Sequence, residues 1–247
     1  MLMSDLPTTD LVKVLVFGEP GSGKTVFACG FPGPILLLDF DNKASSAARF
    51  YAKDTERLKQ INVENMSATF TEDPIAAFSK LVSKLAEEQK TGKYTYKTLV
   101  LDSITTFSMA CLNHIIKTNP GINRTKSTQG TQPSQQDYGI LSREFQRIIP
   151  GLLTLDMNIV MTGHISVEKD DLTGELSRGV LMDGKFGAKL PIFFEEVYRA
   201  HVEEAPGGAR KYLAQTQPNQ KYGKIRSQIP GLPAVVPLAY AELGRKR

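Results

Sequence analysis

One stretch of the chain has the residue types and the spacing of a phosphate-binding loop. It follows the pattern G-x-x-x-x-G-K-T and consists of Gly18, Glu19, Pro20, Gly21, Ser22, Gly23, Lys24 and Thr25,. Glycines let the backbone curl until several N–H groups face one anion, and a helix that follows directs its positive end at it. We expect Lys24 to contact the β and γ phosphates of a nucleoside triphosphate and Thr25 to bind Mg²⁺. The alternative is an ordinary Gly/Pro turn before a helix.

Two apolar runs end in acids that suit the same chemistry. Residues 98–101 are followed by Asp102, and residues 35–38 are followed by Asp39. Unbroken apolar runs of this length, bounded by turn residues, predict strands that are covered on both faces. The carboxyl ends of such strands form the edge where open α/β sheets bind ligands. We therefore expect Asp102 to hold the hydration shell of Mg²⁺ opposite Thr25.

Strand-like runs alternate with helical periodicity, which predicts an α/β fold with a mostly parallel central sheet flanked by helices. We expect strands at 12–17, 35–39, 98–103 and 158–164, and helices at 24–30, 43–51, 73–92, 104–117 and 138–155, the last kinked at Pro150,. Strands at 194–203 and 210–216 flank Pro206-Gly207-Gly208 and predict a C-terminal β-hairpin,. We expect one domain over 1–247, with a core at about 11–204 and the hairpin and basic tail at about 205–247.

Two long polar segments interrupt this pattern, at 118–137 and at 166–184. Polar insertions of this length in a compact domain are usually functional or disordered. We expect both to be loops.

Composition is that of an ordinary globular protein of 247 residues, with 41% hydrophobic and 23% charged residues,. The net charge of +4 permits binding to a polyanion but does not argue for it,. Cys29 and Cys111 are too few and too far apart for a disulfide framework or a zinc site,. Residues 1–10 do not resemble a secretory leader, and no apolar stretch is long enough to span a membrane, so we expect a cytoplasmic location and no membrane partner.

The order of these parts resembles the RecA-like ATPases, above all the small phage-encoded ones linked to single-strand annealing and recombination. The likeness covers roughly residues 11–232 and is carried by residues 18–25, 37–41, 99–103, the strand closing at His164, 184–191 and 221–226. It implies a P-loop ATPase that uses ATP and Mg²⁺, binds single-stranded DNA and forms a homo-oligomer with ATP at subunit interfaces. It also implies a single-strand DNA-binding protein as partner, a role in homologous recombination or annealing, and the host cytoplasm as location.

The resemblance also assigns catalytic roles, to Lys24, Asp41, Asp102 and His164. Asp41 stands where the family's usual Glu activates the attacking water, with Asp39 or Glu19 as alternatives; Asp41 could instead cap the helix that follows. His164 stands where a Gln usually senses the γ phosphate and passes its state to the next loop. A neutral imidazole can donate one hydrogen bond as Gln does. The alternative for His164 is a purely structural role.

The resemblance places DNA-binding loops at the two polar segments. The first contributes Arg124 and Lys126, the second Lys169 and Arg178, and Tyr138 could stack on a base or be a core residue,. Four further cations are candidates for reaching the ATP of a neighbouring subunit, or are solvated surface residues: Lys185, Lys189, Lys224 and Arg226,.

Three other functions compete with a DNA-dependent ATPase. A small-molecule kinase uses the same loop, but should carry an arginine-bearing lid in place of the long polar segments. A GTP-dependent switch needs N-K-x-D, and here Asn42-Lys43-Ala44 is followed by Ser45. A module that binds ATP and DNA but hydrolyses little remains open, because Asp41 is shorter than Glu.

Overall fold

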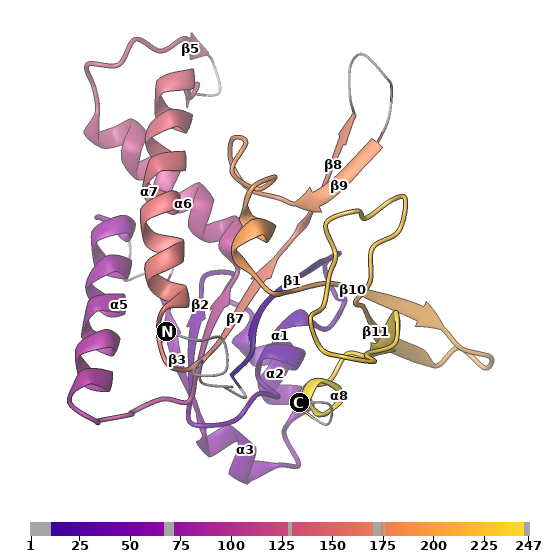
Figure 1. Cartoon of the computed structure of the whole chain (residues 1–247). Coiled ribbons are helices and arrows are strands. Elements are labelled where there is room, and N and C mark those ends of the chain that lie inside the picture. The colour runs from indigo at the N-terminus through magenta and orange to yellow at the C-terminus, as the bar shows by residue number, and fades with distance from the viewer. Residues whose placement is uncertain (1–10, 67–71, 128–129, 170–173, 175, 245–247) are drawn as a thin grey trace, which may run out of the picture.

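The computed structural model describes residues 11–66, 72–127, 130–169, 174 and 176–244. Its centre is an eight-stranded sheet with the order β12-β11-β10-β1-β7-β4-β2-β3 (Figure 1). Neighbours run parallel from β3 to β10, and β11 and β12 each pair antiparallel with the strand before them. The strands are β1 (Lys13–Gly18), β2 (Ile35–Asp39), β3 (Ile61–Asn65), β4 (Thr98–Asp102), β7 (Asn158–Gly163), β10 (Glu196–Glu204), β11 (Arg210–Gln215) and β12 (Val235–Pro237).

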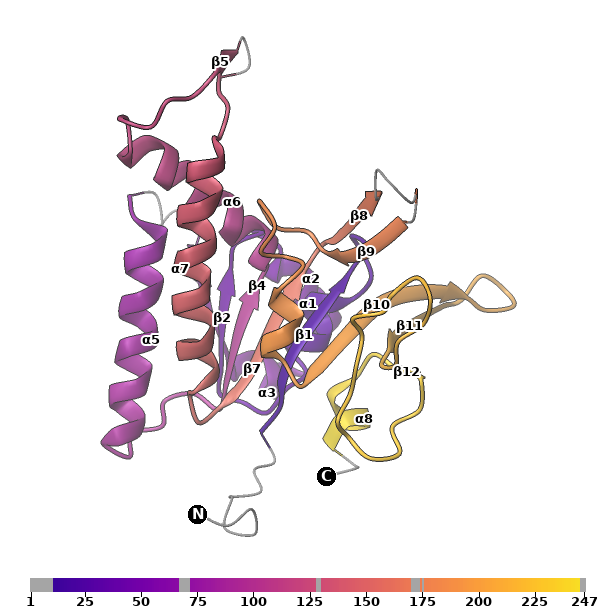
Figure 2. The ribbon, with the colours of Figure 1, turned by 45° about the horizontal axis from the view of Figure 1, so that its top comes forward.

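Helices cover both faces of this sheet, because successive strand residues point to opposite sides. Leu15 and Phe17 of β1 pack into the core cluster under α5 (Pro74–Lys90), α6 (Ile104–Thr118) and α7 (Gln135–Leu153). Val14 and Val16 of the same strand pack into the second cluster, with α1 (Lys24–Ala28), α2 (Ala44–Phe50) and α8 (Tyr240–Gly244). Figure 2 shows the three long helices on one side of the sheet. The predicted α/β fold and C-terminal hairpin are confirmed.

The second polar segment was wrongly expected to be a loop. It contains β8 (Ile165–Lys169) and β9 (Leu176–Val180), which pair antiparallel and project from the end of β7 (Figure 2). Ile165 and Val167 alternate with the polar residues Ser166 and Glu168, so a period of two is present, but it is short and charged residues follow it,. The loop at the tip includes residues that lie outside the described part of the chain.

The first polar segment is shorter than expected, since α7 already begins at Gln135. It holds the short pair β5 (Lys126–Ser127) and β6 (Gly130–Thr131). Sequence reasoning also missed α3 (Thr55–Lys59), β3, β12 and α8, all short elements at the periphery. α7 continues through Pro150, which lies in its last turn. No described helix has both the length and the apolar character needed to cross a membrane.

Phe107 lies at the centre of the core between the sheet and the long helices. Its ring centroid is 4.9 Å from those of Phe40 and Phe78 and 5.6 Å from that of Phe145. We expect Phe107→Ala to lower the free energy of unfolding by about 3–5 kcal/mol, because it removes apolar contacts and leaves a cavity. Met109→Ala, on the exposed side of the same helix, should change it by less than ~0.5 kcal/mol,. Urea unfolding measures both, and equal effects would contradict this account of the core.

Candidate nucleotide site

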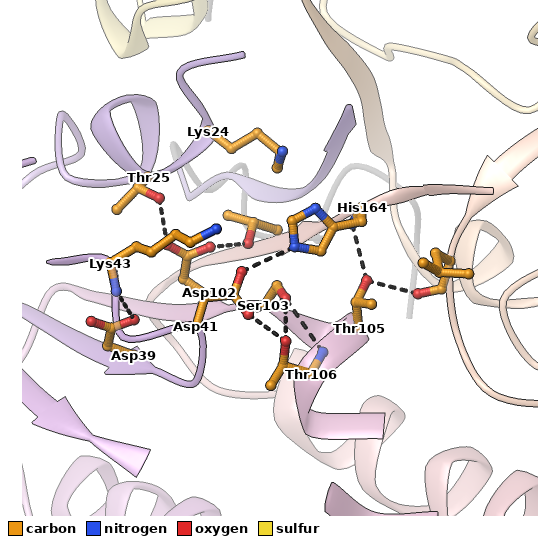
Figure 3. A network of polar contacts seen from close by, with 12 residues as sticks. Lys24, Thr25, Asp39, Asp41, Lys43, Asp102, Ser103, Thr105, Thr106 and His164 are labelled. Atoms are coloured by element: carbon orange, nitrogen blue, oxygen red, sulfur yellow. Dashed lines mark hydrogen bonds and ion pairs between the residues drawn. The ribbon is translucent and has the colours of Figure 1, made fainter. Parts of the chain in front are cut away.

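Four parallel strands end together and bring the predicted catalytic residues to one place. Asp39 at the end of β2 is in register with Asp102 of β4, and Phe17 of β1 is in register with Gly163 of β7. The loops that leave these ends line a cavity of about 380 Å³. Its walls include nine of the predicted site residues: Pro20, Gly21, Ser22, Gly23, Lys24, Thr25, Asp41, Asp102 and His164. The side chains of Lys24, Thr25, Asp41, Asp102 and His164 converge in Figure 3.

Glycine is required in the phosphate loop by its neighbours in the sheet. A Cβ at Gly18 would lie 2.2 Å from the carbonyl oxygen of Ala200 in β10. Gly23 has a φ of +88°, and a Cβ there would lie 2.9 Å from Cδ1 of Tyr212 in β11. β10 and β11 therefore lie directly against the phosphate loop and leave no room for side chains at these two positions.

Lys24 is folded back over the loop that carries it. Its ammonium donates to the carbonyl oxygens of Gly18 at 2.9 Å and Glu19 at 3.0 Å, and lies 3.4 Å from Ser22 Oγ. Burial lowers the pKa of Lys24, and the charges of Asp102 and Asp41 act against that effect. Phosphate oxygens are stronger acceptors than carbonyls, because they are charged. The Lys24 ammonium therefore lies over the phosphate loop, where the phosphates of a bound nucleotide would replace the carbonyl oxygens as its acceptors.

Thr25 and Asp102 form the predicted metal pair. Thr25 Oγ1 donates to Asp102 Oδ2 at 2.6 Å, and Thr162 Oγ1 donates to the other carboxylate oxygen. Burial raises the pKa of Asp102, and these two hydrogen bonds oppose the rise. A hydroxyl and a carboxylate are the hard oxygen donors that suit Mg²⁺, which keeps several waters and takes phosphate oxygens as further ligands. The pair therefore fits a metal that a triphosphate would also bind.

Asp41 is held as an ion by three donors. Its Oδ1 accepts from Ser103 Oγ at 2.9 Å and from Thr106 Oγ1, and its Oδ2 accepts from His164 Nε2 at 3.1 Å. Burial acts to raise the pKa of Asp41, but the hydrogen bonds from His164, Thr106 and Ser103 together outweigh it and lower the pKa to about 2,. Asp41 is therefore a carboxylate at neutral pH.

Asp39 has a different task. Its two carboxylate oxygens accept from the backbone N–H groups of Lys43 at 3.0 Å and Ala44 at 2.7 Å, at the start of α2. The alternative in which Asp41 caps this helix is wrong, because Asp39 makes those contacts. Asp39 is also buried, at 2% exposure, and does not line the cavity, so it is a poor substitute for Asp41.

His164 connects the site to the β8–β9 hairpin. Its backbone N–H donates to Thr105 Oγ1 at 3.0 Å, and Thr105 Oγ1 donates to the carbonyl of Leu181 at 2.7 Å. The N–H of Leu181 returns to the carbonyl of His164 at 2.8 Å. The side chain of His164 thus contacts Asp41 while its backbone closes the base of the hairpin (Figure 3).

Several other residues of the cavity wall were not predicted as site residues. Lys43, Ser46 and Phe50 come from the start and the end of α2, Tyr212 comes from β11, and Leu238 follows β12. Phe50 is 67% exposed and Tyr212 is 43% exposed. The ring of Phe50 contacts that of Tyr51, with the centroids 4.9 Å apart. In the sequence, Phe50 at the end of the helix after Asp41 was a signal that an apolar side chain lines the cavity.

The four predicted interface cations lie apart from this cavity. Lys185 and Lys189 are exposed before the 3₁₀ helix η2 (Leu190–Phe193). Lys224 donates to the carbonyl of Ala188 at 3.0 Å, and Arg226 donates to the carbonyls of Pro191 at 2.6 Å and Phe194 at 2.9 Å. Arg226 thereby holds the end of η2, and contact with a neighbouring subunit stays a prediction for all four.

Of the predicted DNA contacts, two are engaged within the fold. Arg124 makes a buried, two-pronged ion pair with Asp137, at 2.9 and 2.6 Å. This pair lowers the pKa of Asp137 and fixes the start of α7. Tyr138 packs against the core and against Gly184, in agreement with its structural alternative.

The other three lie on the two hairpins. Lys126 lies in β5, Lys169 is exposed in β8, and the guanidinium of Arg178 lies 5.9 Å from the ring centroid of Tyr222. Contact with DNA stays a prediction for these three residues.

Comparison with known families accounts for this arrangement. The model of the AAA domain family matches residues 11–227. The chain belongs to the AAA domain family. The matched span contains every site residue predicted above, while Leu238 lies beyond it. A comparison with curated proteins finds no match. Among solved structures, this AAA domain is similar to the KaiC-like protein of the hyperthermophilic archaeon Pyrococcus horikoshii OT3, with 14% identity and a TM-score of 0.44, over 82% of this chain and 76% of that one.

The hydrogen bonds to Asp41 can be tested through its titration. Thr106→Val removes one donor to Oδ1, so the pKa of Asp41 should rise from about 2 toward its usual value of ~3.9,. Carboxylate ¹³C chemical shifts followed by NMR against pH measure the pKa of Asp41.

The same shift makes stability depend on pH. Because the folded-state pKa of Asp41 lies below the unfolded one, its contribution to the free energy of unfolding is present above about pH 4 and is lost as the pH falls toward 2,. This loss should be smaller in Thr106→Val. Thr118→Val, exposed on the same helix, should leave the titration unchanged. An unshifted Asp41 in Thr106→Val would contradict the network.

Proposed function

We propose that this AAA domain binds and hydrolyses ATP with Mg²⁺ and is a RecA-like protein that acts on single-stranded DNA, in recombination or annealing of phage DNA. The observation that carries the proposal is the convergence of three features in one cavity. Lys24 supplies the phosphate-loop cation, Thr25 and Asp102 form a metal-binding pair, and Asp41 is an ionised carboxylate beyond them.

The chain's own residues divide the chemistry between them. The loop amides and Lys24 hold the phosphates, and Thr25 and Asp102 are the protein ligands for the metal. When bound, Mg²⁺ neutralises charge that develops on the transferred phosphoryl group. Asp41, with its low pKa, would orient and polarise the attacking water through a hydrogen bond, while the site keeps the reactants in position. His164, bonded to Asp41 and to the base of the β8–β9 hairpin, would link the state of the γ phosphate to that hairpin.

The apolar side of the cavity suits the nucleobase. Phe50 and Tyr212 are exposed aromatic residues on the cavity wall, and Leu238 lies beside Gly23 of the phosphate loop. Aromatic faces stack on bases, and apolar side chains cover them from water. We assign adenine to the space among these three side chains, which the sequence alone did not identify.

The β8–β9 hairpin is the part best suited to DNA. Val167 is paired with Arg178, and Lys169 is paired with Leu176, so all four lie on one face of the hairpin,. Val167 is 55% and Leu176 is 46% exposed. Cations for the phosphates beside apolar surface for the bases are the two components of single-strand binding. We extend the proposal to a homo-oligomer with ATP at its interfaces and to a single-strand DNA-binding protein as partner.

A second function is favoured by the state of Asp41. Both of its carboxylate oxygens are occupied by donors from the protein, and an acceptor so engaged has less capacity to polarise a water,. The alternative is a module that binds ATP and DNA with little hydrolysis.

Asp41→Asn separates these two functions. If Asp41 polarises water, we expect the variant to bind ATP within about twofold of wild type but to lose ~10²-fold or more in turnover, since one general base contributes that much. Calorimetric binding and a phosphate-release assay measure the two quantities. Unchanged turnover would favour the binding module, and equal loss of affinity and rate would indicate a structural role for Asp41.

ATP hydrolysis with and without single-stranded DNA, at several salt concentrations, tests the whole proposal. We expect stimulation by DNA that fades as salt rises, because phosphate contacts release counterions. Lys24→Ala should abolish turnover while the far-ultraviolet circular dichroism stays the same. Turnover that requires a small-molecule acceptor and ignores DNA would favour a kinase, and full turnover in Lys24→Ala would remove the phosphate-loop assignment.

A further inference from the structure

A second lysine, Lys43, lines the cavity from the segment that follows β2. Its backbone is held firmly: its N–H donates to Asp39 Oδ1 at 3.0 Å, and the preceding Asn42 has a φ of +55° and accepts from Asn65 Nδ2 at 3.1 Å. Figure 3 shows the Lys43 side chain extending from this anchor toward Thr25 and Asp102. An anchored backbone with a side chain reaching into the site indicates a placed cation.

The ammonium group of Lys43 has no acceptor in the part of the chain that the structure describes. Lys24 lines the same cavity, so two side chains with like charge share this space. Two like charges that share a cavity repel each other, and an anion between them removes that repulsion.

The order of groups along the cavity indicates which part of the ligand Lys43 meets. The phosphate loop holds one end of a triphosphate, and the Thr25–Asp102 pair marks the metal position next to it,. Lys43 follows Asp41, the candidate water-polarising group, by two residues. Because Lys43 and Asp41 both line the cavity and leave the same turn after β2, we expect Lys43 to lie near the terminal phosphate, where water attacks.

We propose that Lys43 binds the γ phosphate of ATP as a second cation from the same chain, and so lets the site distinguish ATP from ADP. This inference rests on the proposed nucleotide site. The contact to the γ phosphate was otherwise predicted for Lys185, Lys189, Lys224 and Arg226 of a neighbouring subunit. Within the described part of this chain, these four residues do not line the cavity. ADP lacks the γ phosphate, so Lys43 would contribute to the binding of ATP alone.

Equilibrium binding of a non-hydrolysable ATP analogue and of ADP to the purified full chain tests the proposal. In Lys43→Ala, we expect the affinity for the ATP analogue to fall roughly tenfold, as for the loss of one charged hydrogen bond, and the affinity for ADP to stay within about twofold. Lys43→Arg should retain most of the preference for the ATP analogue, because it keeps the charge. Lys53→Ala, an exposed lysine just after α2 that does not line the cavity, should change neither affinity.

Each result decides the matter. Wild-type affinities for both ligands in Lys43→Ala would overturn the inference and make Lys43 a solvated surface residue. Equal loss for both ligands, with an unchanged thermal unfolding midpoint, would overturn it as well, since the contact would then not be to the γ phosphate. A wild-type chain that binds neither nucleotide would overturn the proposed function itself, together with this inference.

Discussion

The site depends on a buried carboxylate that two threonine hydroxyls keep in place. Asp102 is 2% exposed and accepts from Thr25 after β1 and from Thr162 in β7, the strand that lies between β1 and β4. Burial of such a group is costly unless donors satisfy it. These hydrogen bonds therefore connect the helix after the phosphate loop to β4 and β7. They fix Asp102 beside Thr25 at the floor of the cavity.

A second network extends from this centre to the surface. Asp41 joins the end of β2 to the first turn of α6 through Ser103 and Thr106, and to the end of β7 through His164. The backbone of His164 then closes the base of the β8–β9 hairpin with Leu181. The contact between Asp41 and His164 is therefore connected to an exposed hairpin through directly bonded groups.

Much of this site was readable from the sequence because its residues lie on local patterns. Lys24 and Thr25 belong to one continuous motif, and Asp102 ends a run of apolar residues that is typical of a covered strand,. The β8–β9 hairpin was missed because its alternation is short and charged residues follow it, and β3 was missed because an edge strand with exposed side chains has no apolar run. The separate tasks of Asp39 and Asp41 also escaped the sequence, since both are carboxylates within one short turn.

By itself, the sequence determined the α/β class and the phosphate-loop pattern, and it predicted Thr25 and Asp102 as a metal pair at one edge of the sheet, because parallel strands bring their carboxyl ends together wherever apolar runs end. Tertiary structure alone decided which groups complete the cavity. Tyr212 and Leu238 reach the phosphate loop only because β11 and β12 extend the sheet beyond β10. Arg124, predicted to contact DNA, instead forms a buried ion pair with Asp137. Such contacts depend on how distant elements are placed in space, and a local pattern of residues carries no record of that placement.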